Sequence, residues 1–441
     1  MLYFIIFTFT LGFIYALVVT IFFIGLLRLR NEDVNPTLGK SKSGGIYLGA
    51  EQSDLFSQGC LNHSLPSVSV VVAARNEADN LPACLKSLLT QSYPSEQYEV
   101  VVIDDHSTDN TYSIARAFAV DNPILKVLRL DDTAECGIKR ISLNSEIRIP
   151  MGKQMALDWG IQACRGEIIL STDADCIVPK TWIESMVKAY ERKIGVVVGF
   201  SMLNEGCQET RLRAKRKVGE PSIDSSLTKF HRFLRSLFIK LQSLELLSLF
   251  SAFAGGLKMG VALACTGNNL AYRRQVYDEL GGFVNLGITV AEDNMFLQWV
   301  DRYSKWHIKP ICHTDVTVLT HPMRTVRDFM RQRLRWASNS TENRLSLVCF
   351  MVIAYGFYLL LPTALLLAVF GALLWKFTLV FLSLKLIPEF LLVLRGLKLF
   401  NRMDLLKYFP LLEPCQILYV LICGIFGLLF NVIWKGRQFS S

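Results

Sequence analysis

The chain has 441 residues, of which 51% are hydrophobic and only 19% are charged. With its positive mean hydropathy, this composition excludes an ordinary soluble enzyme and predicts a partly membrane-embedded protein. The basic residues behind the net charge of +9 flank apolar segments more than they form a basic domain, which favours anionic lipid headgroups over nucleic acid as a partner. Eleven cysteines without C-x-x-C or metal-type spacing predict reduced thiols and a cytosolic soluble portion.

Residues 1–27 form an uncharged apolar stretch that is long enough to cross a membrane, which needs about 20 apolar residues. The first basic residues, Arg28 and Arg30, follow it. A cleaved signal peptide would have a basic start and a shorter apolar core. We therefore expect an uncleaved anchor with its C-terminal side in the cytosol. The polar segment 28–66 then suits a linker.

Residues 67–341 are expected to form one cytosolic domain, in which short apolar runs alternate with segments of helical spacing. The expected strands are 68–73, 98–103, 124–130 and 167–172, and the expected helices are 78–91, 109–120 and 153–163. Such alternation predicts an α/β fold: a Rossmann-like, mostly parallel sheet with helices on both faces.

The regular alternation stops after Phe200. Residues 211–217 contain five basic residues, which fits either a loop contacting a membrane surface or phosphate, or a solvated loop. Within 226–260, Phe230, Phe233 and Leu237 recur at helical spacing among basic residues. This amphipathic helix either lies in the membrane interface or packs on the domain.

The C-terminal hundred residues contain three further apolar segments, 345–375, 377–394 and 415–434. The basic loop 395–413 is placed in the cytosol by the positive-inside rule, together with the segment after the first span. Four spans satisfy both loops, but the basic tail with Lys435 and Arg437 then falls outside. The main alternative is a long 345–375 element that is part interfacial and part spanning.

Acidic residues follow three of the expected strands. Glu77 comes after the first strand, Asp104 and Asp105 end the second, and Asp173 and Asp175 follow the strand at 167–172. The carboxyl ends of parallel strands meet at the sheet edge where ligands bind. A divalent cation and a phosphorylated ligand would relieve the repulsion among these carboxylates. An isolated Asp-x-Asp, by contrast, is usually an ordinary strand-to-loop junction.

Five other ionisable residues have a structural interpretation that we prefer. Asp109 is better explained as a helix cap than as a ligand. His313 and His321 could ligate a metal, but a lone histidine is more often structural. Lys385 and Glu389, four residues apart in an apolar segment, are expected to pair with each other rather than to mark a lipid or glycan path.

Seven motifs occur in order between residues 67 and 337. They are the run 70–77 (Val-Val-Val-Ala-Ala-Arg-Asn-Glu), Asp104-Asp105, Gly152-Lys153, Asp173-Ala174-Asp175, Thr266-Gly267-Asn268-Asn269, Glu292-Asp293 and Gln332-Arg333-Leu334-Arg335-Trp336. Each is weak alone, but the set within an α/β domain is specific. The chain resembles a membrane-bound glycosyltransferase of family 2, with the nucleotide-diphospho-sugar transferase (family A) fold.

The resemblance implies a donor site, a metal site, a base and an acceptor side. The donor-binding residues would be Ala74, Glu77, Asp104, Asp105, Lys153, Asp173 and Arg335, and Asp173 with Asp175 would bind Mn²⁺ or Mg²⁺. Asp293 would be the general base. The acceptor would meet Gly267, Asn268, Asn269, Glu292, Gln332 and Trp336. Arg335 and Trp336 also fit an alternative, a basic amphipathic helix that leads into the membrane.

This resemblance implies inverting, metal-dependent transfer from a nucleotide-diphospho-sugar, first of all a UDP-sugar. The acceptor would be a lipid or a lipid-linked acceptor at the cytosolic face of the cell membrane, in a multi-pass protein with a cytosolic catalytic domain. Two alternatives remain at this stage. One is a processive polysaccharide synthase, and the other is a non-catalytic membrane assembly subunit of the same fold.

Overall fold

The structure is a computed structural model of the chain. It describes residues 1–29, 65–130, 152–205, 225–263, 267–286, 289, 291–338, 343–429, 432–434 and 437–439. The basic run 211–217 and Thr266 therefore lie outside the described residues. Contacts divide the chain into two compact units. An α/β unit comprises Arg30–Ser201 and Ala264–Thr320, and a helical unit comprises Met1–Leu29, Met202–Leu263 and His321–Ser441.

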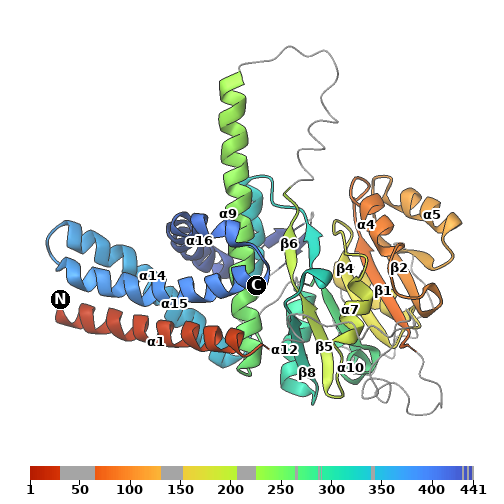
Figure 1. The fold of residues 1–441 in the computed structure, drawn as a ribbon, viewed down its shortest axis with the longest axis horizontal. Helices are drawn as coiled ribbons and strands as arrows, with labels where there is room; N and C mark the ends of the chain where they lie inside the picture. The colour runs from red at the N-terminus through yellow and green to blue at the C-terminus, as the bar shows by residue number, and fades with distance from the viewer. Residues whose placement is uncertain are drawn as a thin grey trace. The chain divides into compact units, whose positions relative to one another are not determined.

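The α/β unit is built on a seven-stranded sheet with the order β3-β2-β1-β4-β7-β5-β8 (Figure 1). Its strands are β1 (Val68–Ala74), β2 (Tyr98–Asp105), β3 (Leu125–Leu130), β4 (Ile168–Asp173), β5 (Ile194–Gly199), β7 (Leu270–Arg273) and β8 (His307–Ile311). All neighbouring strands are parallel except β7, which runs antiparallel to both β4 and β5. The predicted mostly parallel sheet is confirmed.

Helices cover both faces of this sheet. They are α4 (Leu81–Leu88), α5 (Thr111–Asp121), α6 (Lys153–Gln162), α7 (Trp182–Lys188), α10 (Arg274–Glu279), α11 (Gly282–Asn285) and α12 (Glu292–Tyr303), with the short η1 (Ser95–Gln97) and η2 (Thr314–Val316). Leu81 and Leu85 of α4 join Val70 and Val72 in one core cluster. On the opposite face, a Cβ at Gly160 of α6 would lie 2.8 Å from Val71 Cγ1. Because β1 is covered on both faces, its sequence is a continuous apolar run.

The helical unit contains α1 (Leu2–Leu27), α9 (Ser225–Lys258), α13 (Val326–Ser338), α14 (Leu345–Val369), α15 (Trp375–Leu399) and α16 (Phe409–Leu429). Shorter elements are η4 (Met403–Tyr408), β10 (Val432–Trp434) and β11 (Arg437–Phe439). Two further short strands of the chain are β6 (Ser201–Leu203) and β9 (Val318–Thr320). By length and composition, α1, α9, α14, α15 and a segment that includes most of α16 could each cross a membrane.

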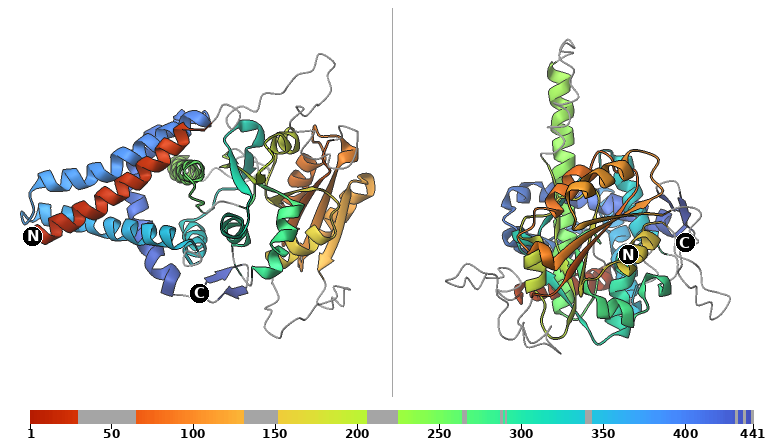
Figure 2. Two further views of the ribbon diagram at one scale, coloured as in Figure 1. Left: turned by 90° about the horizontal axis from the view of Figure 1, so that it is seen from below. Right: turned by 90° about the vertical axis from the view of Figure 1, so that its right-hand side faces the viewer.

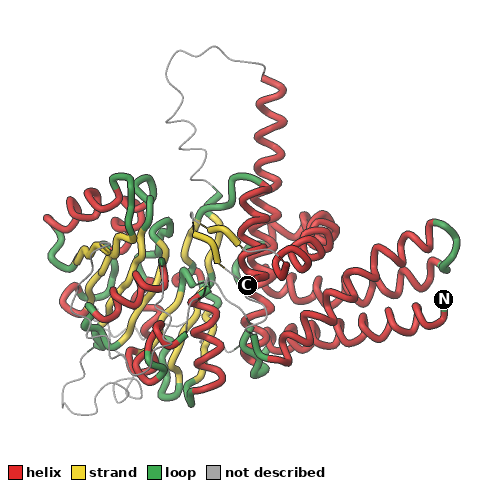
Figure 3. Tube along the Cα trace, turned by 180° about the vertical axis from the view of Figure 1, so that it is seen from behind, coloured by secondary structure: helices red, strands yellow, loops and turns green. Residues whose placement is uncertain are grey.

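Three of these apolar helices form a bundle, and the other two cross it. Phe22 of α1 contacts Phe350 of α14 and Tyr15 contacts Phe357, so α1 and α14 are antiparallel. Helix α15 runs back beside them. Figures 1 and 2 show that α9 and α16 run crosswise to α1, α14 and α15, and Figure 3 shows the same arrangement from behind.

Close approach of backbones fixes the crossings of α9. A Cβ added at Gly255 of α9 would lie 2.0 Å from the carbonyl oxygen of Phe22, and one added at Gly25 would lie 2.0 Å from that of Gly255. A Cβ at Gly396 of α15 would lie 2.0 Å from Ser251 Oγ. Small residues at such contacts are typical of helices packed in membranes. Helix α9 therefore crosses both α1 and α15 near their C-terminal ends.

The C-terminal helices differ in their bounds from the expected segments. Helix α14 ends at Val369 rather than at residue 375, because Gly371 adopts φ +72° and the amide of Ala372 bonds the carbonyl of Leu367 at 2.8 Å. This is a Schellman cap, in which a glycine terminates the helix. Most of the expected loop 395–413 is helical, because α15 continues to Leu399 and α16 begins at Phe409.

A buried lysine of the helical unit is paired with two carboxylates. The Nζ of Lys385 lies 2.9 Å from Glu389 Oε2 and also contacts Glu413 of α16. Tyr15 and Tyr358 donate to Glu389 from α1 and α14. The expected structural pair of Lys385 and Glu389 is therefore present, and its network joins four helices. Such pairing offsets the cost of burying ionised groups.

Candidate active site

The ends of β1 and β2 carry the first acidic residues of the site. Asp104 is 1% exposed and lies in register between Ala74 and Arg129. Its nearest cation is Arg129, with Nε 3.7 Å from Oδ2, and neither of its oxygens has a hydrogen-bond partner among the described residues. Buried carboxylates normally accept hydrogen bonds, so Asp104 retains the capacity to accept them from a ligand. Ala74 is buried beside it.

The loops after these two strands are tied together. The amide of Thr108 donates to Asn76 Oδ1 at 2.8 Å, and the amide of Glu77 donates to Thr111 Oγ1 at 2.8 Å. Asp109 accepts the Thr111 and Ala78 amides, which gives it the expected structural role at the start of α5.

Two further carboxylates of these loops have partners nearby. Asp105 Oδ1 lies 2.9 Å from His106 Nδ1. The side-chain amide of Asn80 donates to Glu77 Oε2 at 2.6 Å. Together with Asp104, they form an acidic group along the carboxyl edge of β1 and β2.

Lys153 connects two acidic motifs that are far apart in sequence. Its Nζ lies 2.7 Å from Asp173 Oδ1 and 3.1 Å from Glu292 Oε1. Gly152, which precedes α6, has φ +68°, a conformation that glycine adopts without a Cβ penalty. Burial opposes protonation of the lysine, but Asp173, Glu292 and Asp293 outweigh it and raise its pKa well above the ordinary value.

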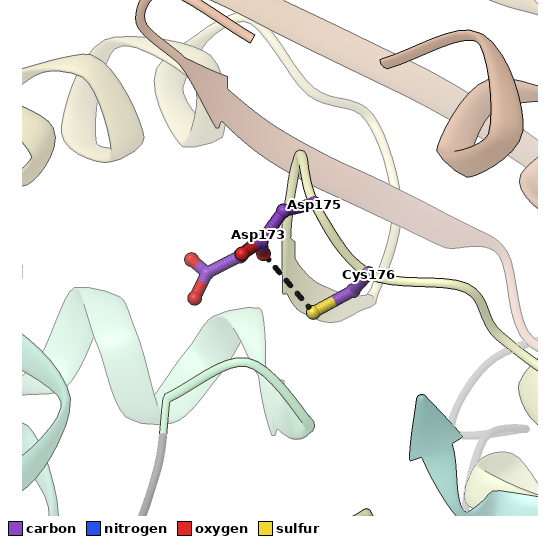
Figure 4. Close-up of side chains that lie close together, drawn as sticks. All are labelled: Asp173, Asp175 and Cys176. Atoms are coloured by element: carbon purple, nitrogen blue, oxygen red, sulfur yellow. Dashed lines mark hydrogen bonds between the residues drawn. The ribbon is translucent and has the colours of Figure 1, made fainter. Parts of the chain in front are cut away.

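Asp173 and Asp175 form the candidate metal site. One ligand atom from each of Asp173, Asp175 and Cys176 lies within 4.8 Å of the others, and Figure 4 shows the three side chains together at the end of β4. Burial and the nearby aspartates raise the pKa of the Cys176 thiol well above its usual value, so the thiol donates to Asp175 Oδ1 at 3.5 Å. The two carboxylates thus supply hard oxygen ligands, which suit Mn²⁺ or Mg²⁺.

Gly267 provides the space for Asp293. A Cβ at residue 267 would lie 2.4 Å from Asp293 Oδ2, so a side chain there is incompatible with the observed carboxylate position. Asp293 is the second residue of α12, and its Oδ1 accepts the Asn294 amide at 2.8 Å. The N-terminus of a helix favours negative charge. Asp293 is part-exposed, whereas Glu292 is buried against Lys153.

The two asparagines after Gly267 have structural roles. Asn269 is fully buried; its amide donates to the carbonyls of Phe200 and Val316, and its oxygen accepts from Trp182 Nε1. Asn268 Oδ1 accepts from Ser201 Oγ at 2.7 Å. The Asn269 side chain, which the resemblance placed on the acceptor side, therefore has its hydrogen-bonding groups engaged within the α/β unit. Both residues hold the loop that carries Gly267.

The sequence interpretation missed two contributors to this site. Gln154 is buried and donates to the carbonyl of Phe283 at 2.9 Å, while its oxygen accepts the Thr289 amide at 3.2 Å. It thereby connects α6 to the segment that leads into Glu292. Cys176 orients Asp175, as described above. In the sequence, the only indication of their roles was that Gln154 directly follows Lys153 and that Cys176 directly follows Asp175.

The remaining candidate residues, Gln332, Arg335 and Trp336, lie on α13 of the helical unit. His313 has a structural contact, because its Nδ1 accepts the Asp315 amide at 3.2 Å. The α/β unit therefore brings together the donor, metal and base candidates Asp173, Asp175, Lys153, Glu292 and Asp293, with Gly267 against Asp293.

Family comparison identifies the class of protein. The model described as glycosyltransferase like family 2 matches residues 66–339, which is more than half of the chain. The model of glycosyl transferase family 21 matches residues 244–441. The chain belongs to glycosyltransferase like family 2, as the motifs indicated.

Individual relatives agree with this class. The β-monoglucosyldiacylglycerol synthase of Nostoc sp. is 30% identical over 284 residues, 64% of this chain and 50% of that protein. The glycosyltransferase AglE of Haloferax volcanii is 28% identical over 182 residues, 39% of this chain and 54% of that protein. The chain thus spans about half the length of these two relatives.

A solved structure is similar in fold. The mannosyltransferase PcManGT from Pyrobaculum calidifontis, in complex with GDP-Man and Mn²⁺, has a TM-score of 0.51 and 15% identity, covering 96% of this chain and 99% of that one. At this identity the likeness concerns the fold alone, and it confirms the predicted family A architecture.

The space beside Gly267 yields a first prediction. Gly267→Ala should lower the rate of sugar transfer about tenfold or more, because a displacement of about 1 Å at a reacting group is costly, while nucleotide affinity should stay unchanged. Steady-state rates and calorimetric titration of nucleoside diphosphate measure the two effects. Gly356→Ala, whose Cβ would lie 3.3 Å from Leu11, is the matched control. If Gly267→Ala transferred sugar at the normal rate, the prediction that Asp293 is the general base would be contradicted.

The raised pKa of Lys153 yields a prediction on pH dependence. A lysine whose pKa is higher in the folded than in the unfolded chain stabilises fully below the unfolded value of about 10.4. This stabilisation is lost as the pH rises through the folded value. The difference in thermal stability between the native chain and Lys153→Met should therefore be constant from about pH 6 to 9 and shrink only above about pH 10.4. A difference that disappears near neutral pH would show that Lys153 is not held protonated.

Proposed function

We propose that the chain transfers a sugar from a nucleotide-diphospho-sugar to a lipid or lipid-linked acceptor at the cytosolic face of the membrane, with inversion at the anomeric carbon. The observation that carries this proposal is the meeting of Asp173, Asp175, Lys153 and Asp293 at one edge of the sheet. The name of the Nostoc relative, a monoglucosyldiacylglycerol synthase, supports a lipid acceptor.

The donor would lie along the carboxyl ends of β1, β2 and β4. Asp104, with Asp105, Glu77 and Ala74 beside it, supplies the surroundings for a nucleoside. A base or ribose could donate to the buried Asp104 oxygens, which have no hydrogen-bond partner among the described residues. Lys153 would meet the ribose or the diphosphate. A UDP-sugar is the first donor to test.

The two aspartates after β4 would hold Mn²⁺ or Mg²⁺. A divalent ion there would neutralise the departing diphosphate. Lys153 Nζ lies 2.7 Å from Asp173 Oδ1 and already balances part of its charge. The Cys176 thiol keeps Asp175 oriented.

Asp293 would act as the general base. It takes the proton from the acceptor hydroxyl as that oxygen attacks the anomeric carbon. The new carbon–oxygen bond forms on the face opposite the breaking bond to the diphosphate, and the nucleoside diphosphate leaves with the bonding electrons. Glu292 is less suited to this role, because its Oε1 lies 3.1 Å from Lys153 Nζ and its side chain is only 7% exposed.

A rate measurement tests the proposal. The purified chain with diacylglycerol, Mn²⁺ and a panel of UDP- and GDP-sugars should release nucleoside diphosphate and form a glycolipid. Asp293→Asn should bind donor normally and transfer about 10²- to 10⁴-fold more slowly, the usual contribution of a general base. Asp278→Asn, at an exposed acid of α10, is the control.

The outcomes of that experiment separate the competing functions. A long polymer would support a processive synthase, for which a 21% identical relative, the poly-β-1,6-N-acetyl-D-glucosamine synthase of Staphylococcus epidermidis, is the precedent. Absence of metal-dependent donor binding would favour a non-catalytic subunit. Normal transfer by Asp293→Asn would show that the base is another group.

We further propose that α1, α14 and α15 span the membrane, and that α9 lies in its cytosolic interface. Helix α9 crosses α1 at Gly25 and α15 at Gly396. The basic residues Arg28 and Lys398 come two or three positions after these glycines, so they lie near the same end of the bundle. Its 34 residues measure about 50 Å, whereas the hydrocarbon core is about 30 Å thick. By the positive-inside rule, this end of the bundle is cytosolic.

Helix α16 would then also remain on the cytosolic side. The preceding η4 packs on α9, and the following β10 packs on α13, which is itself joined to α9 by Arg333 and Glu245. Both ends of α16 therefore lie near α9 and α13, on the side of the helical unit that we assign to the cytosol. This arrangement of three spans removes the conflict that four spans create for the basic C-terminal tail.

Cysteine labelling distinguishes three spans from four. In intact cells, a membrane-impermeant maleimide should label Phe370→Cys, at the exposed turn between α14 and α15, and should not label Arg437→Cys. After lysis, Arg437→Cys should react as well. The native chain gives the background of its own cysteines. Labelling of Arg437→Cys in intact cells would restore the fourth span.

A further inference from the structure

Helix α13 carries a buried arginine in the middle of the Gln-x-x-Arg-Trp motif. Arg333 is 7% exposed, whereas its neighbour Arg331 has a side-chain exposure of 54%. Arg333 is not one of the residues that define the motif. A buried guanidinium needs partners for its donors, and those partners determine what the residue can do.

One carboxylate on α9 receives the charge of Arg333. The Nε donates to Glu245 Oε1 at 2.7 Å, and Nη2 contacts Glu245 Oε2. Glu245 is 2% exposed. The hydroxyl of Tyr419, on α16, donates to the same Oε1 at 2.7 Å. The two-pronged pair therefore connects α13 with α9, and the tyrosine adds α16.

The same guanidinium also contacts two motif side chains. Its Nη1 donates to Gln332 Oε1 at 2.7 Å, and its central carbon lies 4.1 Å from the centre of the Trp336 ring and 4.3 Å from that of Phe329. Planar stacking combined with a forked hydrogen bond is specific to arginine, because lysine presents only a point charge. Arg333 thus fixes an amide and an indole at the same time.

We infer that Arg333 is a positioning residue, held by Glu245 and Tyr419, which sets the orientation of Gln332 and Trp336 for the acceptor. This inference rests on the proposed function, in which those two side chains meet the acceptor. Arg333 itself does not touch the substrate. Through Glu245, the two side chains proposed to meet the acceptor are held in a fixed position relative to α9, the helix that we place in the membrane interface. Helix α9 would therefore position α13 at the surface where a lipid acceptor lies.

The test compares substitutions of the anchor in the full chain, reconstituted in lipid nanodiscs. Arg333→Lys keeps the charge but loses the fork, and it should raise the KM for diacylglycerol, or lower kcat, about tenfold or more. Donor affinity, measured by calorimetric titration with nucleoside diphosphate and Mn²⁺, should be unchanged. Tyr419→Phe, which removes one hydrogen bond, should give a smaller effect in the same direction. Arg331→Lys, on the same helix, is the control.

Each outcome of this comparison has a distinct meaning. Folded Arg333→Lys and Tyr419→Phe variants with native acceptor kinetics would overturn the inference. If Arg333→Lys fails to fold, Tyr419→Phe decides alone. An equal loss of donor binding would also overturn it, because a positioning role is confined to the acceptor. Failure of the proposed function is separate: the native chain would then bind donor without glycosylating lipid.

Discussion

The contact of Lys153 with Asp173 and Glu292 is the interaction on which the site depends. Without a cation between them, the acidic groups that follow β4 and begin α12 would repel one another. Lys153 stands at the first turn of α6, and Gln154 beside it holds the segment before α12. One helix terminus thus sets the separation between the candidate metal-binding aspartates and the candidate base. The backbone that delivers this lysine requires a glycine at residue 152.

In the helical unit, too, buried cations hold carboxylates from different elements together, here in apolar surroundings. Two of its buried cations meet carboxylates from another helix: Lys385 meets Glu413, and Arg333 meets Glu245. Apolar packing alone gives little preference for one arrangement of helices in a bilayer, whereas an ion pair that is split leaves two charges uncompensated. The polar networks therefore specify which helices are neighbours, while the glycines at residues 25, 255 and 396 specify how closely they approach.

The sequence predicted the parts of this structure that depend on local pattern. Strands β1, β2 and β4 are buried on both faces, so their apolar runs were unambiguous, and the acidic residues at their ends followed from chain direction. Three features could not be predicted. Hydropathy measures how apolar a helix is but carries no direction, so the crosswise run of α16 relative to α1, α14 and α15 could not be predicted. The internal bonds of Asn269 depend on partners from three other segments, at Trp182, Phe200 and Val316. The entry of β7 into the sheet depends on pairing between distant strands. The end of α14, by contrast, could have been predicted, because Gly371 is a residue type that commonly terminates helices.

The antiparallel direction of β7 has a consequence for how the site is assembled. The parallel strands deliver residues to the catalytic edge only where they leave the sheet. Strand β7 instead enters the sheet at that edge, since Leu270 pairs with Ser171 near the end of β4 and with Val198 near the end of β5. A segment that precedes a strand can therefore stand beside segments that follow strands, and Gly267 reaches Asp293 by this route. Because one strand is reversed, residues reach this edge from segments that precede a strand as well as from segments that follow one. The segment beside Asp293 can therefore change its sequence without altering the loops after β1 and β2 that we propose to bind the donor.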